Sequence, residues 1–291
     1  MSEELILSPH DVLWHERRRQ VYTASDMGVL FGLPGFASRT LSDVWHEKRY
    51  GLEADKSTPS TRLGQRMEPI ILDEAEEVLG KIIDRQKWMV SGSIGATLDG
   101  RREEDGRPVE AKTAGLLWKA DEEWGDSGDE IPSSIILQVQ AQLLVTEADL
   151  GYVPAIIGGR GFVLFEVGRQ ESLIKDMKVR VADFLQTIAN DAPPPEPPQL
   201  ETLKRLRREP GSVTPRSDEL DAAFERYQKV NETAKAAEKV KEEAQRTLLA
   251  MLAGTEAAEC RDGMITYYQQ TRRESYTPAS TFRVMRFKKG K

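Results

Sequence analysis

The chain has 291 residues, of which 39% are hydrophobic and 31% are charged, a composition typical of globular proteins that fold in water. It has no apolar run of the roughly 20 residues that a membrane-spanning helix needs. The opening residues, MSEELILSPHD, do not resemble a signal peptide, and one cysteine, Cys260, excludes an intrachain disulfide. We therefore expect a cytoplasmic protein.

The formal net charge of −7 is unevenly distributed. Residues 261–291 contain eight Lys and Arg against two Asp and Glu, a balance of +6, so the rest of the chain carries −13. Basic clusters at 17–19, at 204–208 and in the tail are candidates for phosphate contacts. The three histidines are not spaced as a zinc site, so a bound metal would have oxygen ligands, which favours Mg²⁺ or Mn²⁺.

In chain order, the first two thirds alternate between helical and strand patterns. We predict helices at 40–49 and 63–79, a strand at 82–90, a hairpin of 93–98 with 108–113, a helix from Pro132 to about 146, a strand pair at 151–157 and 161–167, and a helix at 171–188. This order predicts a mixed α/β (α+β) fold in which helices flank a mixed sheet.

A proline-rich stretch, APPPEPPQ at 192–199, divides the chain, because five prolines in six residues exclude a continuing helix or sheet. We expect a first domain at 1–191, a linker at 192–199 and a C-terminal region at 200–291. In that region 218–252 is predicted to be one long helix with a thin, alanine-rich apolar stripe, which favours close packing on a partner or a coiled coil. Strands at 264–268 and 282–287 are expected to follow, with a basic tail.

Three acidic residues and a lysine form the strongest chemical pattern. Asp99 ends the first strand of the predicted hairpin, and Glu110 and Lys112 alternate on the second strand, so their side chains leave the same face of the sheet. Glu68 lies near the start of the helix at 63–79. Carboxylates, together with a carbonyl such as that of Ala111, are the ligands that Mg²⁺ prefers, and a lysine beside them can orient water or stabilise a phosphate in transition.

The less specific interpretation is a surface hairpin with scattered charges, since an Asp and a Glu-x-Lys at this separation often occur by chance among 48 acidic residues. Two observations favour the site. Asp99 ends a strand of small and apolar residues, SIGATLD, and Glu110 and Lys112 alternate with Val109 and Ala111. Charges in strands that otherwise suit burial are costly unless they face a site.

The segments around these residues resemble the YqaJ-type viral recombinases, a lambda-exonuclease-like family of the PD-(D/E)xK nuclease superfamily. The matching stretches, in order, are WHERRRQVYTASDMGVLFGL, LGQRMEPI, ATLDG, VEAKT and ILQVQAQLLVT, and the resemblance covers about residues 14–190. It implies a restriction-endonuclease-like core and a Mg²⁺-dependent exonuclease. Such an enzyme would digest one strand of duplex DNA 5′→3′ and leave a 3′ single strand for an annealing protein, in the host cell of a phage or prophage.

Residue by residue, the resemblance implies that Glu68, Asp99 and Glu110 bind the metal and that Lys112 is the catalytic lysine. It further implies that four residues contact a terminal 5′-phosphate or the DNA: Arg18, Ser25, Thr97 and Gln138. The chain departs from the superfamily pattern at Leu98, where a proline is usual, and in the region after Pro198, which exceeds the minimal nuclease.

Two other functions stay open. The same fold could support a structure-specific or nicking endonuclease, which would also cut a closed circle. Alternatively, the long helix and basic tail could belong to a non-catalytic DNA-binding or assembly factor with a degenerate core. A homo-oligomer is compatible with any of these functions.

Overall fold

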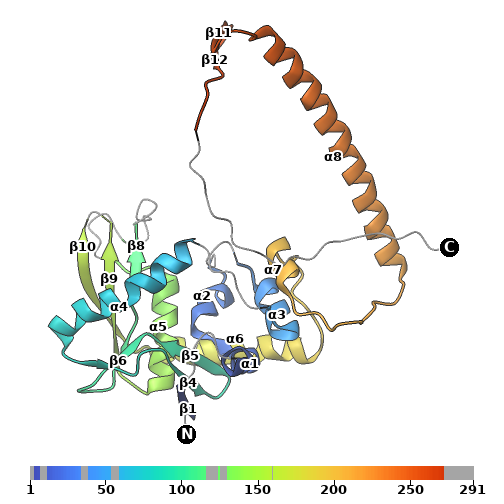
Figure 1. The fold of residues 1–291 in the computed structure, drawn as a ribbon. Coiled ribbons are helices and arrows are strands. Elements are labelled where there is room, and N and C mark those ends of the chain that lie inside the picture. Colours follow the sequence, from blue (N-terminus) through green and yellow to red (C-terminus); the bar gives the residue numbers. More distant parts are fainter. Residues whose placement is uncertain are drawn as a thin grey trace. The chain divides into compact units, whose positions relative to one another are not determined.

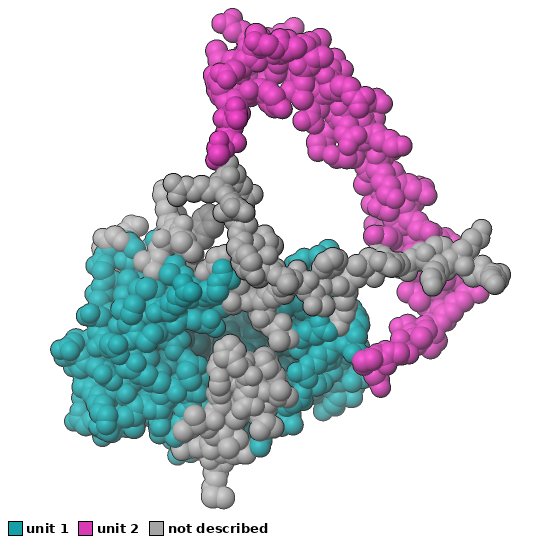
Figure 2. Space-filling model, viewed as in Figure 1, with its two compact units in different colours: residues 1–208 teal, residues 209–291 magenta. Residues whose placement is uncertain are grey.

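The computed structural model describes residues 3–6, 12–33, 39–53, 59–115, 124, 130–158 and 160–271. The chain forms two compact units, unit 1 at Met1–Arg208 and unit 2 at Glu209–Lys291 (Figure 2). The mixed α/β core lies in unit 1, and unit 2 contains a long helix and a small hairpin. None of the helices in the described ranges is both long and apolar enough to cross a membrane.

Unit 1 has the predicted mixture of helices and strands (Figure 1). Its helical elements are α1 (Val12–Gln20), the 3₁₀ turn η1 (Ala24–Asp26), α2 (Met27–Leu30), α3 (Leu41–Tyr50), α4 (Pro59–Leu79), α5 (Ser133–Thr146), α6 (Glu171–Ala189) and α7 (Leu200–Arg205). Its strands are β1 (Glu3–Ile6), β2 (Tyr22–Thr23), β3 (Ile82–Ile83), β4 (Lys87–Ser91), β5 (Ile94–Leu98), β6 (Gly100–Arg102), β7 (Pro108–Val109), β8 (Lys112–Ala114), β9 (Leu150–Ile157) and β10 (Gly161–Gly168).

The strands form two sheets that meet at Asp99. One has the order β1-β4-β5-β2, and the other has the order β10-β9-β7-β6-β3 with β8 also paired to β9. The chain leaves the first sheet at the end of β5 and enters the second at β6, so Asp99 occupies the crossing point. Gly100 is required there because a Cβ atom would collide with the side chain of Ile82.

The predicted hairpin between 93–98 and 108–113 is wrong in its pairing. Strand β5 pairs antiparallel with β4 and parallel with β2, and the hairpin is formed by β6 with β7, where Gly100 faces Val109. The switch of sheets at Asp99 divides what looks like one strand in the sequence. The antiparallel register nevertheless brings Asp99 opposite Glu110, as the hairpin prediction required.

Helix α5 lies at the centre of the core because it is apolar around most of its circumference. On one side it packs with β4, β5, α2 and α6 in a cluster that includes Met89, Leu98 and Ala141. On another side Val139 and Leu143 pack against β9 and β10. Its three glutamines, at 138, 140 and 142, therefore lie inside or at the edge of the core rather than on an outer surface.

Helix α4 covers the second sheet through a narrower apolar face. Leu72, Ala75 and Leu79 pack with Val109 of β7 and Tyr152 of β9. The helix begins at Pro59, four residues before the predicted start, so Glu68 lies mid-helix and not near its beginning. This position, one turn before the buried face, places Glu68 beside the sheet crossing.

The chain after α6 packs against α3. The amide of Gln199 donates to Oδ1 of Asp43 (2.7 Å), and Leu206, which is buried, forms an isolated bridge with Leu52. Unit 1 therefore includes the proline-rich stretch and α7 and extends to Arg208.

Unit 2 contains the long helix α8 (Asp218–Met251), which agrees with the predicted helix at 218–252. Ser217 begins it, since its Oγ accepts a hydrogen bond from the amide of Leu220 (3.1 Å). Two antiparallel strands follow, β11 (Ala257–Cys260) and β12 (Gly263–Thr266). The second of these coincides with most of the predicted strand at 264–268, whereas the predicted strand at 282–287 lies outside the described residues.

Candidate active site

The crossing between the sheets places two of the predicted acids next to each other. Asp99 lies between β5 and β6, and Glu110 follows β7, whose backbone pairs with the strand after Asp99. The amide of Ala111 donates to Oδ2 of Asp99 (2.9 Å), and the amide of Glu110 donates to the carbonyl of Tyr152 (2.9 Å). Backbone hydrogen bonds thus fix both acidic residues relative to the sheet.

Glu110 is nearly inaccessible, with 3% of its surface exposed, and it accepts hydrogen bonds at both carboxylate oxygens. Oε1 accepts from Nζ of Lys112 (2.5 Å) and from Nε2 of Gln138 (2.6 Å), and Oε2 accepts from Gln142. Nζ of Lys112 also donates to Oε1 of Gln138 (3.1 Å). Glu110, Lys112 and Gln138 are therefore each hydrogen-bonded to the other two. With Gln142 as a third donor, the buried carboxylate of Glu110 has its hydrogen-bonding capacity largely filled.

Glu68 approaches from α4 and is held by a residue that the sequence patterns did not indicate. Nε2 of Gln86 donates to Oε1 of Glu68. Gln86 lies in the turn between β3 and β4 with φ of 62°, and Asp84 in the same turn has φ of 55°. Two non-glycine residues in the left-handed region within three positions are uncommon, and such conformations concentrate at functional sites.

These acidic residues carry more charge than their neighbours compensate. Burial, followed by the charges of Glu110 and Glu68, raises the pKa of Asp99 well above its ordinary value of 3.8. Burial and the charge of Glu110 likewise raise the pKa of Glu68, despite the hydrogen bond from Gln86. Burial alone would lower the pKa of Lys112, but the charges of Glu110 and Asp99 outweigh it and raise that pKa. Three carboxylates thus share one ammonium among the described residues, which is the electrostatic setting that a bound cation relieves.

The donor set is compatible with a hard divalent ion, although the described side chains do not form a ready-made cage. Among the residues the structure describes, no group of three or more His, Cys, Asp or Glu side chains is arranged to hold a metal. Mg²⁺ does not require one, because it retains several waters and is commonly bound through one or two carboxylates and a substrate phosphate. Asp99 and Glu68, which line the same pocket, supply such a pair.

The predicted phosphate-binding residues lie on the neighbouring strand. Strand β2 pairs parallel with β5, with Thr23 opposite Gly95, and this brings the Thr-Ala-Ser segment beside the strand that ends at Asp99. Nη2 of Arg18, from α1, lies 3.4 Å from Oγ1 of Thr23 and 3.4 Å from Oγ of Ser25. Ser25 is exposed, whereas Thr23 is 1% exposed.

One pocket of about 180 Å³ joins the two groups of residues. It is lined by Arg18, Thr23, Ala24, Ser25, Glu68, Gln86, Thr97, Asp99 and Gln138. We call Glu68, Asp99, Glu110 and Lys112, in and behind the pocket wall, the acidic half of the site, and Arg18, Thr23 and Ser25 its basic half. Since a water molecule occupies about 30 Å³ in the liquid, the pocket has room for several waters or for a phosphate group with its hydration.

Every residue that the sequence analysis selected lies in or beside this pocket. Glu110 and Lys112 do not line it themselves but contact Gln138, which does. The backbone amide of Ala111, rather than its carbonyl, makes the contact with Asp99. Sequence patterns did not indicate Gln86 or Gln142, nor the buried carboxylate of Asp26 behind Thr23.

Comparisons with known proteins were consistent with one another. Residues 13–149 match the model of the YqaJ-like viral recombinase domain. The chain is 30% identical over 168 residues to "Uncharacterized protein YqaJ" of Bacillus subtilis (strain 168), an alignment that covers 55% of this chain and 51% of that protein. The chain therefore spans about half the length of the curated relative it matches.

The chain resembles two solved structures to different degrees. The alkaline exonuclease LHK-Exo from Laribacter hongkongensis, in complex with dAMP, has a TM-score of 0.50 at 16% identity, over 62% of this chain and 94% of that chain. A phage related exonuclease from Haemophilus somnus 129PT has a TM-score of 0.46 at 11% identity, over 58% of this chain and 94% of that chain. At these identities the likeness to LHK-Exo establishes a shared fold, and the predicted fold class is confirmed.

Proposed function

We propose that the protein, whose residues 13–149 match the model of the YqaJ-like viral recombinase domain, is a metal-dependent deoxyribonuclease that degrades duplex DNA from an end. The proposed polarity is 5′→3′, with a 3′ single strand left for phage-type recombination. A single observation carries the proposal: one pocket is lined by Asp99 and Glu68 on one side and by Arg18 and Ser25 on the other. An acidic site for hydrolysis and a cationic site for a terminal phosphate are what an end-directed nuclease requires.

Mg²⁺ is the proposed cofactor, with Mn²⁺ as a substitute. Glu68, Asp99 and Glu110, with the carbonyl of Ala111, are the proposed ligands. When bound, the ion would supply charge neutralisation at the phosphate and a more acidic water. The excess negative charge of the acidic half supports this choice, because burial, together with the charges of neighbouring carboxylates, raises the pKa values of Asp99 and Glu68.

Lys112 is proposed to act as a charged donor. Its pKa is raised, so it keeps its proton at neutral pH, and its ammonium is anchored on Oε1 of Glu110 at 2.5 Å. From that position it would stabilise the negative charge that develops on the phosphate oxygens as water attacks. Gln138, which contacts both Glu110 and Lys112, would place its amide on the phosphate or on the attacking water.

The basic half is proposed to hold the terminal 5′-phosphate. Arg18 presents a guanidinium, which binds phosphate through charge-assisted hydrogen bonds, and Ser25 and Thr97 add hydroxyl groups at the pocket wall. Binding of the terminal phosphate here would place the next phosphodiester at the acidic half. On this proposal the polarity would follow from the terminal phosphate, because a 3′-hydroxyl end lacks the group that this half would recognise.

Two labelled substrates test the proposal. A linear duplex labelled on each strand and a covalently closed circle are incubated with the protein and Mg²⁺. We expect loss of the 5′-ended strands, survival of the complementary single strands and an intact circle. Nicking of the circle would instead establish the endonuclease alternative. DNA binding without any Mg²⁺-dependent cleavage would establish the non-catalytic alternative.

The product of this reaction also defines the proposed partner. A long 3′ single strand is the substrate of a single-strand annealing protein, which is the partner we propose, in the host cytoplasm of a phage or prophage. Self-association through unit 2 is a further proposal, and the mass of the full chain in solution tests it.

A further inference from the structure

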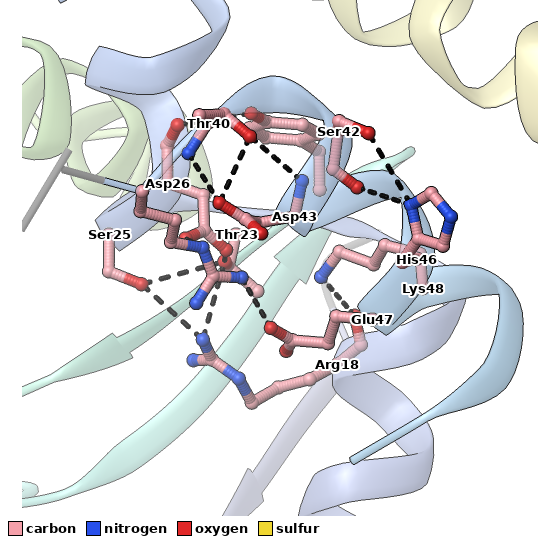
Figure 3. A network of polar contacts seen from close by, with 12 residues as sticks. Arg18, Thr23, Ser25, Asp26, Thr40, Ser42, Asp43, His46, Glu47 and Lys48 are labelled. Carbon is pink, nitrogen blue, oxygen red and sulfur yellow. Dashed lines mark hydrogen bonds and ion pairs between the residues drawn. The ribbon is translucent and has the colours of Figure 1, made fainter. Parts of the chain in front are cut away.

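Behind the basic half lies a buried pair, Thr23 and Asp26, whose side chains are hydrogen-bonded at 2.5 Å (Figure 3). Thr23 is 1% exposed and Asp26 is 4% exposed. The two residues are close because the 3₁₀ turn η1 begins directly after Thr23 and ends at Asp26. Asp26 does not line the pocket, yet it contacts a residue that does.

The carboxylate of Asp26 is held ionised by surrounding cations. Oδ1 lies 3.3 Å from Nε of Arg39, which in turn pairs with Glu47. Burial on its own would raise the pKa of Asp26, but the charges of Arg39, Lys48 and Arg18 outweigh it and lower the pKa to about 2. At neutral pH Asp26 is therefore an acceptor only, and the hydrogen of this contact comes from Thr23.

The direction of the hydrogen bond from Thr23 to Asp26 determines which hydroxyl group in the pocket can donate. A threonine hydroxyl has one proton, and once that proton points at Asp26, Oγ1 of Thr23 can only accept from its other neighbours. Those neighbours are Nη2 of Arg18 at 3.4 Å and Oγ of Ser25 at 3.5 Å. Between the two hydroxyls, only that of Ser25 then has a proton to donate, and Ser25 is exposed to the pocket.

The same network holds the backbone of Arg18. Nζ of Lys48, a residue of α3 that is 4% exposed, donates to the carbonyl oxygen of Arg18 (2.6 Å). Figure 3 shows the Lys48 ammonium directed at α1 while the Arg18 guanidinium extends the other way, towards Thr23 and Ser25. Both the main chain and the side chain of Arg18 are thus tied to the cluster that contains Asp26.

We propose that Asp26 is a positioning residue for recognition of a 5′-phosphorylated DNA end. By accepting the proton of Thr23, it makes Thr23 an acceptor that aligns the Arg18 guanidinium. Ser25 then has the only donor proton of the two hydroxyls, and it can turn that proton from Oγ1 of Thr23 to a bound phosphate. The inference rests on the proposed function of the basic half, and it adds a residue outside the pocket that sets the preference for a phosphate.

The chain offers a matched control. Thr40 and Asp43 have the same spacing, and Oγ1 of Thr40 donates to Oδ2 of Asp43 (3.0 Å). Asp43 is as buried as Asp26, with 1% exposed. This second pair forms the capping box of α3 and, among the described contacts, reaches neither Arg18 nor Ser25. Its loss should therefore affect stability alone.

The test measures binding rather than cleavage. Hairpin duplexes with one open end, either 5′-phosphorylated or 5′-hydroxyl, are titrated with the full chain in Ca²⁺, and the ratio of the two Kd values gives the phosphate preference. We expect Asp26→Asn and Thr23→Val to lower that preference by about tenfold, the usual effect of a charge-assisted hydrogen bond. Thr23→Ser should restore it, and Asp43→Asn and Thr40→Val should leave it unchanged while lowering Tm.

An unchanged preference in folded Asp26→Asn and Thr23→Val would overturn the inference, as would a wild-type chain that binds both ends equally. If Asp26→Asn does not fold, the contrast between Thr23→Val and Thr23→Ser decides. Wild-type binding that prefers the phosphate without any cleavage in Mg²⁺ would leave this inference standing and reject the nuclease.

Discussion

In the acidic half of the site, Glu68, Asp99 and Glu110 share one ammonium, whereas behind the basic half Asp26 lies among Arg39, Lys48 and Arg18. The pKa values diverge accordingly. That of Asp99 is raised well above 3.8, and that of Asp26 is lowered to about 2. Asp99 follows β5 and Asp26 lies in the turn that follows β2, and these two strands are neighbours in one sheet, so the charges around each carboxylate distinguish them.

The contrast separates two ways of building a phosphate site. The acidic half is under-compensated, and a cation and a substrate would complete it. Behind the basic half, the negative charge of Asp26 is balanced by Arg39 and Lys48, so these residues can hold Arg18 in place before a ligand binds. The donors of the basic half are held in place before binding, so they lose less entropy when a ligand binds. The acidic half has excess negative charge, which favours binding of a cation.

The largest effect is expected from Asp99→Asn, which keeps the shape of the side chain and removes one charge from the acidic half. Mg²⁺-dependent cleavage should fall at least about 1000-fold, because one proposed metal ligand is lost and the charge excess is reduced. Initial rates on a linear duplex measure this. Asp149→Asn, which breaks an exposed ion pair with Arg107, is the control and should cleave at the wild-type rate.

Lys112→Met should lower cleavage by about 100- to 1000-fold, the range found when one preorganised donor to a developing charge is removed. Single-turnover rates at saturating Mg²⁺ separate this loss from weaker binding. Lys81→Met, which removes an exposed ion pair with Glu103, should have no such effect. Equal single-turnover rates for the Lys112 variant and the wild type would show that Lys112 has no role in the chemical step.

Gln86→Ala should weaken Mg²⁺ binding about 10- to 100-fold through loss of its hydrogen bond to Glu68. Calorimetric titration of the DNA-free protein measures the affinity. The effect should vanish when Glu68 is already replaced by Ala, because Gln86 acts through it. Gln186→Ala, which breaks an exposed amide contact with Asn190, is the matched control.

The smallest effects are on stability, and they should have opposite signs in the two halves. The folded pKa of Asp26, about 2, lies below its ordinary 3.8, so its contribution is present above about pH 4 and is lost as the pH falls towards 2. Asp26→Asn should therefore cost on the order of 2 kcal/mol at pH 7 and progressively less below pH 4. Without divalent ions, Asp99→Asn should instead raise Tm, since it removes a buried like charge. Urea and thermal unfolding measure both.

The positions of residues that depend on local sequence patterns could be predicted from the sequence. Alternation on a strand placed Glu110 and Lys112 on one face, and helical periodicity found α4, α5, α6 and α8 within a few residues of their ends. The pairing of β5 could not be predicted, because an Asp-Gly step at a switch between sheets looks like the middle of a hairpin.

The supporting residues were missed for a different reason. Gln86 acts through a turn whose left-handed backbone has no periodic signal. Gln142 lies in an apolar helix, and its role as a donor to Glu110 can be recognised only once the structure shows that the two side chains face each other. Asp26 depends on Arg39 and Lys48, which follow it by 13 and 22 positions and reach it only after α3 has packed.

The most direct test of the central claim, that a divalent cation completes the acidic half, is a calorimetric titration of Mg²⁺ into the DNA-free chain and its Asp99→Asn variant. We expect saturable binding to the wild type and none to the variant. Equal heats for both proteins, or no binding to the wild type with or without a phosphorylated DNA end, would contradict it.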